Sequence, residues 1–283
     1  MGKSTLLNAL VGEKMSIITS KPQTTRHRII GIVSSEEFQI VFSDTPGFID
    51  EPAYRMHQMM NAFISLSFDD ADIILFVTDP FEPLSDQHNL LQRIASHKLP
   101  VLAIINKQDM VREEELAARI AELAALLPEI RIHTVSALKG TGVQELMADI
   151  ISLLPEGPEF YPKDQLTDRP ERFFVSEIIR GKILELYRDE IPYTCEITID
   201  SFTEGDSNAG PITRISAIVY TLDERKKSIL LGKGGMAIKE LGMAARTEIE
   251  AFLGTRVFLD LNIKVRDNWR DDEKALKSFG YQN

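Results

Sequence analysis

The sequence predicts an α/β chain with two domains, a doubly wound sheet whose first strand is missing and a smaller α+β domain. Short apolar runs alternate with amphipathic helical segments in the first half. Helix-breaking residues then crowd together, namely Pro155, Gly157, Pro158, Pro162 and Pro170, which predicts a linker. Long strands of alternating polarity follow it. We therefore expect domains at 1–154 and 172–283, joined by a linker at 155–171.

The first domain shows the alternation expected of a parallel sheet. A helix is predicted from about Thr5 to Val11, and the polar run 20–28 has no apolar period, so we expect an exposed loop there. Polar clusters end several of the strands, and open sheets of this class bind ligands at the carboxyl ends of their strands. Strands are predicted at 29–34, 38–43, 73–78, 101–105 and 130–135, and helices at 54–67, 85–96, 113–127 and 142–153.

The second domain begins with an amphipathic helix at 172–187. Residues 194–202 alternate, so we expect Cys195, Ile197 and Ile199 to face inward and Glu196, Thr198 and Asp200 to face outward. Cys195 is the only cysteine, which excludes an internal disulfide and favours a core side chain over a nucleophile. Further strands are predicted at 212–222 and 257–265, and further helices at 228–231, 236–252 and 271–279.

Composition excludes several classes of protein. The net charge of the 283 residues is −11, so the whole chain is not a general polyanion binder, and any nucleic-acid site must be a local basic patch. No apolar run is long enough to cross a bilayer, and no secretory signal begins the sequence. With a single cysteine, these features indicate the cytoplasm, while contact with a membrane surface stays open. We expect a monomer.

The first residues match the second half of a phosphate-binding loop, G-x-x-x-x-G-K-[ST], that leads into a helix. Gly2 would let the backbone approach a phosphate, and Lys3 would reach the β- and γ-phosphates. The Ser4 hydroxyl would hold Mg²⁺, and Thr5 opens the helix whose N-terminus favours an anion. An ordinary polar helix start is the alternative for this stretch alone.

A second cluster, Asp44-Thr45-Pro46-Gly47, follows the strand predicted at 38–43. Asp44 would bind Mg²⁺ through water, and the Gly47 amide would contact the γ-phosphate. Thr24 or Thr25 could complete the Mg²⁺ shell, and we favour Thr25. The predicted metal ligands are Ser4, Thr25 and Asp44, and the predicted catalytic residues are Lys3, Thr25 and Gly47.

A third cluster, Asn106-Lys107-Gln108-Asp109, follows the apolar strand predicted at 101–105. The Asp109 carboxylate can accept two hydrogen bonds from guanine, and adenine offers no such donor pair. Lys107 can lie over the base, and Asn106 can tie the loop to its neighbours. Backbone amides at Ser136-Ala137 could read the guanine carbonyl. One alternative for this cluster is an ordinary polar turn. Another is that the protein is an enzyme that uses ATP, and Asp109 disfavours that alternative.

The second domain contains Gly232-Lys233-Gly234-Gly235 between two predicted helices. Glycines at both ends let the backbone come close to a nucleic-acid phosphate. This is the G-x-x-G pattern of a KH domain, which clamps about four nucleotides of single-stranded RNA. The alternative is a flexible turn in a small α+β domain. The predicted RNA-binding residues are Lys226, Lys227, Gly232, Lys233, Gly234, Gly235 and Lys239.

The joint occurrence of these motifs resembles a P-loop GTPase followed by a type II KH domain, the arrangement of the bacterial Era GTPases. The resemblance extends to the strings Gln23–Arg28, Tyr161–Asp164, Thr167–Arg169 and Trp269–Glu273. It implies GTP and GDP with Mg²⁺ as ligands, the 3′ end of 16S ribosomal RNA and the small ribosomal subunit as partners, and a role in assembly of that subunit. It also implies peripheral contact with the cytoplasmic membrane.

Two departures from this family accompany the resemblance. Phe48 follows Gly47, where Ras-like proteins carry a water-orienting glutamine, and Era-like proteins share this hydrophobic replacement. A strand and the first half of the phosphate loop would precede Gly2 in the family. We therefore expect a truncated chain that binds GTP more weakly than its parent, with a gap between the strands at 38–43 and 73–78. The alternative function is an RNA-binding KH protein whose first domain is a non-catalytic scaffold.

Overall fold

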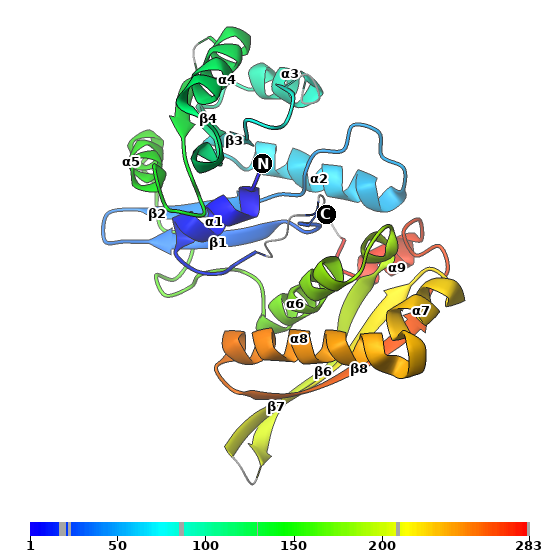
Figure 1. Cartoon of the computed structure of the whole chain (residues 1–283). Helices are drawn as coiled ribbons and strands as arrows, with labels where there is room; N and C mark the ends of the chain where they lie inside the picture. Colours follow the sequence, from blue (N-terminus) through cyan, green and yellow to red (C-terminus); the bar gives the residue numbers. More distant parts are fainter. Residues whose placement is uncertain (17–20, 22–23, 85–87, 129, 208–209, 282–283) are drawn as a thin grey trace. The chain divides into compact units, whose positions relative to one another are not determined.

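The computed structural model describes residues 1–16, 21, 24–84, 88–128, 130–207 and 210–281 (Figure 1). The chain divides into two compact units. Unit 1 comprises Met1–Ile18, Arg28–Glu51 and Asn61–Asp168, and unit 2 comprises Thr19–His27, Pro52–Met60 and Arg169–Asn283. Two short segments from the first half of the sequence therefore belong to unit 2. The domain boundaries given above stay a prediction.

Unit 1 holds two separate sheets within the described residues. The first pairs β1 (Ile29–Ser34) with β2 (Gln39–Asp44) antiparallel, and the second has the parallel order β3-β4-β5, formed by Ile74–Thr78, Val101–Ile105 and Arg131–Thr134. No pairing joins β2 to β3 among these residues, which is the place where we expect a gap.

The helices of unit 1 follow the predicted periods closely. They are α1 (Lys3–Val11), α2 (Arg55–Asp69), α3 (His88–Ser96), α4 (Glu113–Leu126) and α5 (Val143–Leu153), with a short 3-10 turn, η2, at Gln108–Met110. Helix α2 begins in unit 2 and ends in unit 1. The first three residues of the helix predicted at 85–96 lie outside the described part. Strands β3 and β4 bury apolar side chains such as Phe76, Ala103 and Ile105 in the core, because helices cover a parallel sheet on both faces.

Unit 2 has the KH order that the sequence predicts. Helix α6 (Glu171–Leu186) precedes β6 (Glu196–Ser207) and β7 (Gly210–Thr221), then come α7 (Glu224–Leu231), α8 (Met236–Leu253), β8 (Arg256–Val265) and α9 (Glu273–Ser278), with the 3-10 turns η3 (Ile191–Thr194) and η4 (Lys233–Gly235). Among the described residues the sheet order is β6-β7-β8, with β7 and β8 parallel. Its core joins α6, α8 and the sheet through side chains such as Ile183, Ile215 and Ile249. The described helices include none that is long and apolar enough to span a membrane.

Cys195 lies in this core, with no exposed surface. Burial raises the pKa of its thiol to about 12, and only the thiolate reacts with alkylating reagents. We therefore expect iodoacetamide to leave the folded protein unmodified at pH 8 and to alkylate Cys195 after unfolding in urea. Mass spectrometry of the two samples measures this. Rapid alkylation of the folded protein would contradict the placement of Cys195 in the core.

Candidate functional site

The phosphate-loop residues meet the base-loop residues at the start of α1. Gly2 has φ 83°, which favours glycine, and a Cβ there would lie 2.7 Å from Nδ2 of Asn106. Any other residue would therefore push the two loops apart. The ammonium of Lys3 lies 3.8 Å from the place that a Cβ on Gly47 would occupy. Lys3 and Gly47, both predicted to contact the terminal phosphate, are thus neighbours. Thr5 follows in α1, and Thr45 and Pro46 lead from β2 to Gly47.

Two predicted Mg²⁺ ligands are in direct contact. The Ser4 hydroxyl donates to Oδ2 of Asp44 over 2.8 Å, and the Ser16 hydroxyl donates to the same oxygen over 3.0 Å. Asp44 is only 5% exposed. A carboxylate beside a hydroxyl suits Mg²⁺, which prefers oxygen ligands and retains several waters, so these residues fit the ion. Ser16 was not predicted from the sequence. The Asn8 side chain holds it in place through hydrogen bonds of 2.8–3.0 Å with the backbone of residues 15 and 16.

The third predicted ligand, Thr25, belongs to unit 2 and is buried. The neighbouring Thr24 hydroxyl donates to the backbone oxygen of Lys21 over 2.7 Å. The role of Thr25 in binding Mg²⁺ therefore stays a prediction.

Asn106 connects three loops at the carboxyl edge of the parallel sheet. Its Nδ2 donates to the backbone oxygen of Met1 over 3.0 Å, and its Oδ1 accepts from the Ala137 amide over 3.0 Å and the Lys107 amide over 2.8 Å. The side chain is 3% exposed. One amide thus holds the phosphate loop, the base loop and the Ser136-Ala137 loop at fixed spacing.

Asp109, the predicted guanine reader, lies next to that third loop. A hydrogen bond from Ser136 and the charge of Lys139, whose ammonium is 3.5 Å away, keep the pKa of the Asp109 carboxyl below its usual range. The side chain therefore stays ionised near neutral pH, as an acceptor of two hydrogen bonds must. Lys139 was missed because a lysine in a polar turn has no distinctive pattern.

Lys107 is held by an aspartate that the sequence analysis did not single out. Its ammonium lies 2.6 Å from Oδ2 of Asp79, which follows β3 and is 2% exposed. Burial raises the pKa of Asp79, but hydrogen bonds from Lys107 and the terminal ammonium outweigh burial and lower it to about 2. Lys107 itself has φ 62°, and its ammonium lies 5.8 Å from the centre of the Phe81 ring. The position of Asp79 at the end of a buried strand could have revealed it.

Three residues of the polar run at 20–28 depart from their predicted exposure, while positions 20, 22 and 23 lie outside the described residues. Thr25, Arg26 and His27 are all buried in unit 2. Arg26 donates to Oε2 of Glu196 over 3.0 Å and to the backbone oxygens of Cys195, Pro192 and Tyr193. The prediction that Glu196 faces outward to solvent was likewise wrong, since it is 3% exposed.

Aromatic side chains contact the residues of this buried segment. The Tyr281 hydroxyl donates to Glu196 over 2.8 Å. The His27 ring lies 4.5 Å from the ring of Tyr281 and 5.7 Å from that of Phe173, centre to centre. Burial lowers the pKa of His27. The segment that carries Thr25 is therefore anchored inside unit 2 by charge, hydrogen bonds and ring packing together.

The glycine-rich turn of unit 2 lies between α7 and α8. Lys233 and Gly234 are exposed, so the turn is open to a ligand. At Gly232, with φ 71°, a Cβ would lie 2.6 Å from that of Ala237, which requires glycine. Gly234 and Gly235 also have positive φ, but a Cβ there would meet no atom within 4 Å. Ile229 and Met236, exposed by 45% and 64%, flank the turn with apolar surface.

The predicted lysines around the turn differ in their partners. Lys226 lies 2.5 Å from Asp223, and Lys227 lies 3.5 Å from Glu224. Lys233 and Lys239 are exposed and form no ion pair with any described residue. Of the four predicted lysines, Lys233 and Lys239 are therefore the two whose charge is not offset by a carboxylate of the described residues.

The Lys3 loop, the Ser4–Asp44 contact, the Asp109 loop and the open glycine turn define a P-loop GTPase with a KH domain. A family model described as "50S ribosome-binding GTPase" matches residues 1–107, and a "KH domain" model matches residues 190–270. GTPase Era of Carboxydothermus hydrogenoformans is 39% identical over 282 residues, which is 99% of this chain and 94% of that protein. The chain belongs to the Era family of GTPases.

Other relatives support this placement. GTPase Era of Geotalea uraniireducens is 42% identical over 100% of this chain and 94% of its own length. A crystal structure of an Era variant from Aquifex aeolicus, bound to GDP and aluminium fluoride, is 36% identical, with a TM-score of 0.93 over 100% of this chain and 95% of that one. A crystal structure of Era with MgGDPNP and nucleotides 1506–1542 of 16S ribosomal RNA is 35% identical, with a TM-score of 0.94 over the same shares.

Proposed function

We propose that this GTPase binds GTP with Mg²⁺ in unit 1 and the 3′ end of 16S ribosomal RNA at the Gly232–Gly235 turn. Through these two ligands it assists assembly of the small ribosomal subunit and maturation of its RNA. One observation carries the proposal. The crystal structure of Era that matches this chain over its whole length contains MgGDPNP and that region of the RNA. The exposed turn and the Ser4–Asp44 contact supply matching chemistry in this chain.

The predicted site residues of unit 1 have separate roles in hydrolysis. Lys3 neutralises charge on the terminal phosphates, the Gly47 amide donates to the γ-phosphate, and Asp109 selects the guanine base. Ser4 and Asp44 would hold Mg²⁺, and the ion would supply positive charge toward the phosphates of the nucleotide. Phe48 packs partly against the core of unit 1 and has no group that can orient water. Hydrolysis is therefore slow unless a partner or another group positions the water.

The anchoring of Arg26 supports a switch. Residues 24–27, which include the proposed Mg²⁺ ligand Thr25, belong to the RNA-binding unit. A change in these residues with the γ-phosphate would therefore affect the unit that binds RNA. Contact with a membrane surface, which the family implies, stays a prediction.

Titration of the 3′ RNA fragment by fluorescence anisotropy tests the switch. We expect a non-hydrolysable GTP analogue to change RNA affinity at least fivefold relative to GDP. Equal affinities with the two nucleotides would refute the switch. They would leave the alternative, an RNA-binding protein with a scaffold first domain.

The turn itself is tested by Lys233→Glu combined with Gly234→Asp. RNA binding should fall at least a hundredfold, because two carboxylates would face the phosphate backbone. The fold should survive, since both positions are exposed and aspartate tolerates the positive φ of Gly234. Anisotropy and the thermal melt measure the two effects. Lys264→Glu, exposed on β8, is the control for charge alone, and unchanged RNA binding in the double variant would refute this binding surface.

A further inference from the structure

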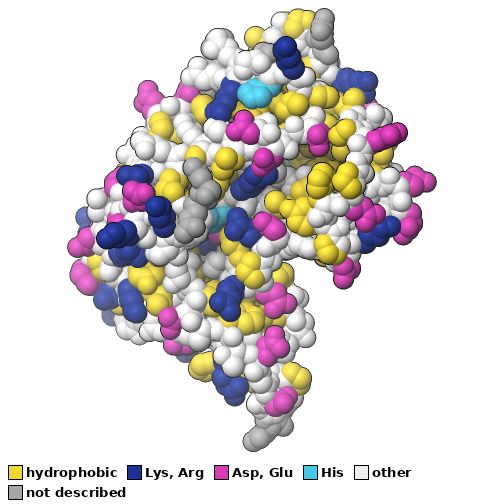
Figure 2. Space-filling view, turned by 180° about the vertical axis from the view of Figure 1, so that it is seen from behind, with side chains coloured by type: hydrophobic (Ala, Val, Ile, Leu, Met, Phe, Trp, Pro, Cys, Tyr) yellow, Lys and Arg dark blue, Asp and Glu magenta, His cyan; other side chains and the backbone are white. Residues whose placement is uncertain are grey.

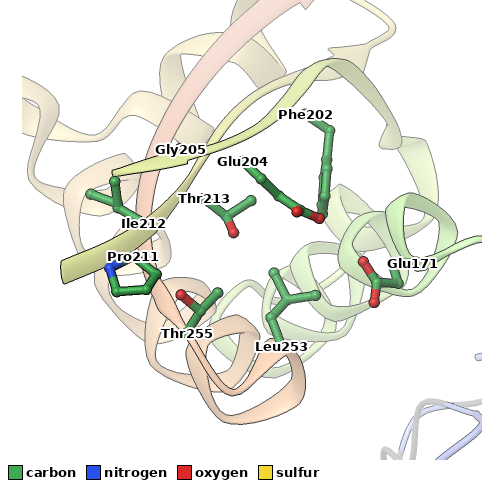
Figure 3. Close-up of a pocket in the computed structure, with 9 residues that line it drawn as sticks. All are labelled: Glu171, Phe202, Glu204, Gly205, Pro211, Ile212, Thr213, Leu253 and Thr255. Carbon is green, nitrogen blue, oxygen red and sulfur yellow. The ribbon is translucent and has the colours of Figure 1, made fainter. Parts of the chain in front are cut away.

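Unit 2 contains a pocket that the proposed function does not use. Its cavity volume is about 290 Å³. The hairpin of β6 and β7 forms one side, and the first turn of α6 and the turn from α8 to β8 form the other (Figure 3). The residues that carry the inference below are Glu171, Phe202, Glu204, Thr213, Leu253 and Thr255.

Thr213 is a buried polar group that faces this pocket. The residue is 3% exposed, and its hydroxyl forms no hydrogen bond with any other described residue. Figure 3 shows its side chain directed into the pocket. The hydroxyl oxygen is not one of the fully buried, unpaired polar atoms of the described residues, so water can reach it from the pocket. A ligand in the pocket would form a hydrogen bond with it in place of that water.

The charge around the pocket is negative. Glu171 and Glu204 both line it, with no ion pair to another described residue, and none of the lining side chains is basic. Arg214 pairs with Thr203 across the hairpin, so strand alternation places both on the opposite face from Glu204 and Thr213. Acidic side chains gather along this hairpin in Figure 2. The pocket therefore favours a cation.

Two helix ends modify this charge. Helix α8 ends at Leu253, and the C-terminus of a helix carries partial negative charge, which adds to the preference for a cation. Glu171 lies in the first turn of α6, where the positive end of that helix offsets part of its charge. Glu204 is therefore the stronger of the two carboxylates toward a ligand.

The remaining wall is apolar, from Phe202 and Leu253. We infer that this pocket binds an alkylammonium group, with the alkyl stem against Phe202 and Leu253 and the ammonium between Glu204 and the Thr213 hydroxyl. Such a group is presented by a lysine side chain of a partner polypeptide or by a free polyamine. Both sources would present the same alkylammonium group to the pocket.

The pocket is distinct from the RNA-binding turn. Helix α8 begins beside Gly235 and ends at Leu253, 18 residues later, which separates the two places by about 27 Å. The turn is basic and the pocket acidic, so one polyanion cannot satisfy both. Binding at the pocket would add a second contact for a basic partner while RNA occupies the turn.

Titration of the full chain with n-butylamine, followed by amide chemical shifts in two-dimensional NMR, tests the inference. We expect the amides of Glu204, Thr213 and Thr255 to shift with a dissociation constant on the order of 1 mM. Glu204→Gln should weaken binding at least tenfold, and Glu171→Gln and Thr213→Val about threefold each. Asp200→Asn, which removes an exposed carboxylate of β6 outside the pocket, should change it less than twofold.

Neutral 1-butanol has the same stem without the charge. Equal shifts with butanol and butylamine, or full affinity in a folded Glu204→Gln variant, would overturn the cation site. 1,4-Diaminobutane and the tripeptide Gly-Lys-Gly then distinguish the two sources. Tighter binding of either one than of butylamine supports the inference and names the source, and binding of neither would overturn it.

Discussion

Replacing Arg26 with alanine should lower the free energy of unfolding of unit 2 by about 3–5 kcal/mol. Arg26 and Glu196 are 2% and 3% exposed, so the substitution would leave the Glu196 carboxylate buried without its cation. The backbone oxygens of Cys195, Pro192 and Tyr193 would lose the same donor. Unpaired buried charges are among the few changes that destabilise a protein this much.

Urea unfolding measured by tryptophan fluorescence isolates this effect. The sequence has one tryptophan, Trp269, which is fully buried in unit 2 and donates to the backbone oxygen of Thr194 over 3.1 Å. Its emission therefore reports on unit 2 alone. Combining Arg26→Met with Glu196→Gln should recover part of the loss, because neither of these two positions then holds an unpaired buried charge.

The control is Lys277→Ala, which removes a surface ion pair with Glu273 in unit 2. The two side chains are 56% and 47% exposed, and such pairs contribute about 0.2–1 kcal/mol. A loss for Arg26→Ala as small as that of Lys277→Ala would show that the buried ion pair does not anchor the segment in unit 2.

Replacing Asp109 with asparagine should shift nucleotide preference from GTP to xanthosine triphosphate by a hundredfold or more. Asparagine offers a donor where the aspartate accepts, and xanthine presents a carbonyl where guanine presents its exocyclic amine. The low pKa of Asp109 means that the wild-type carboxylate is ionised across the neutral range. The preference for GTP should therefore not vary between pH 6 and pH 8.

Competition between the two nucleotides for a fluorescent analogue measures this preference. Asp72→Asn, at an exposed position of unit 1, makes the same chemical change away from the base loop and should leave the preference unaltered. If the Asp109 variant keeps the preference of the wild type, Asp109 does not contact the base.

Local sequence patterns are enough to predict the fold class and the approximate positions of most polar clusters. Parallel strands must end at one edge of a sheet, so Asn106 after β4 and Ala137 after β5 could be expected near each other, and a hydrogen bond joins them. Positive φ at Gly232 and Gly234 follows from a tight turn between two helices. Local periods and chain topology suffice for such predictions.

Which segments cover each face of a strand depends on tertiary packing. Strand alternation correctly separates Cys195 from Glu196, but it cannot reveal that Arg26, 170 residues earlier, buries the outer side. The same is true of Thr25–His27, whose polar composition predicts a loop in water, and of Thr213 in its pocket. The alternation of polar and apolar residues shows which side chains share a face of a strand. The solvent exposure of that face depends on segments distant in sequence, and the local sequence pattern does not show how those segments pack.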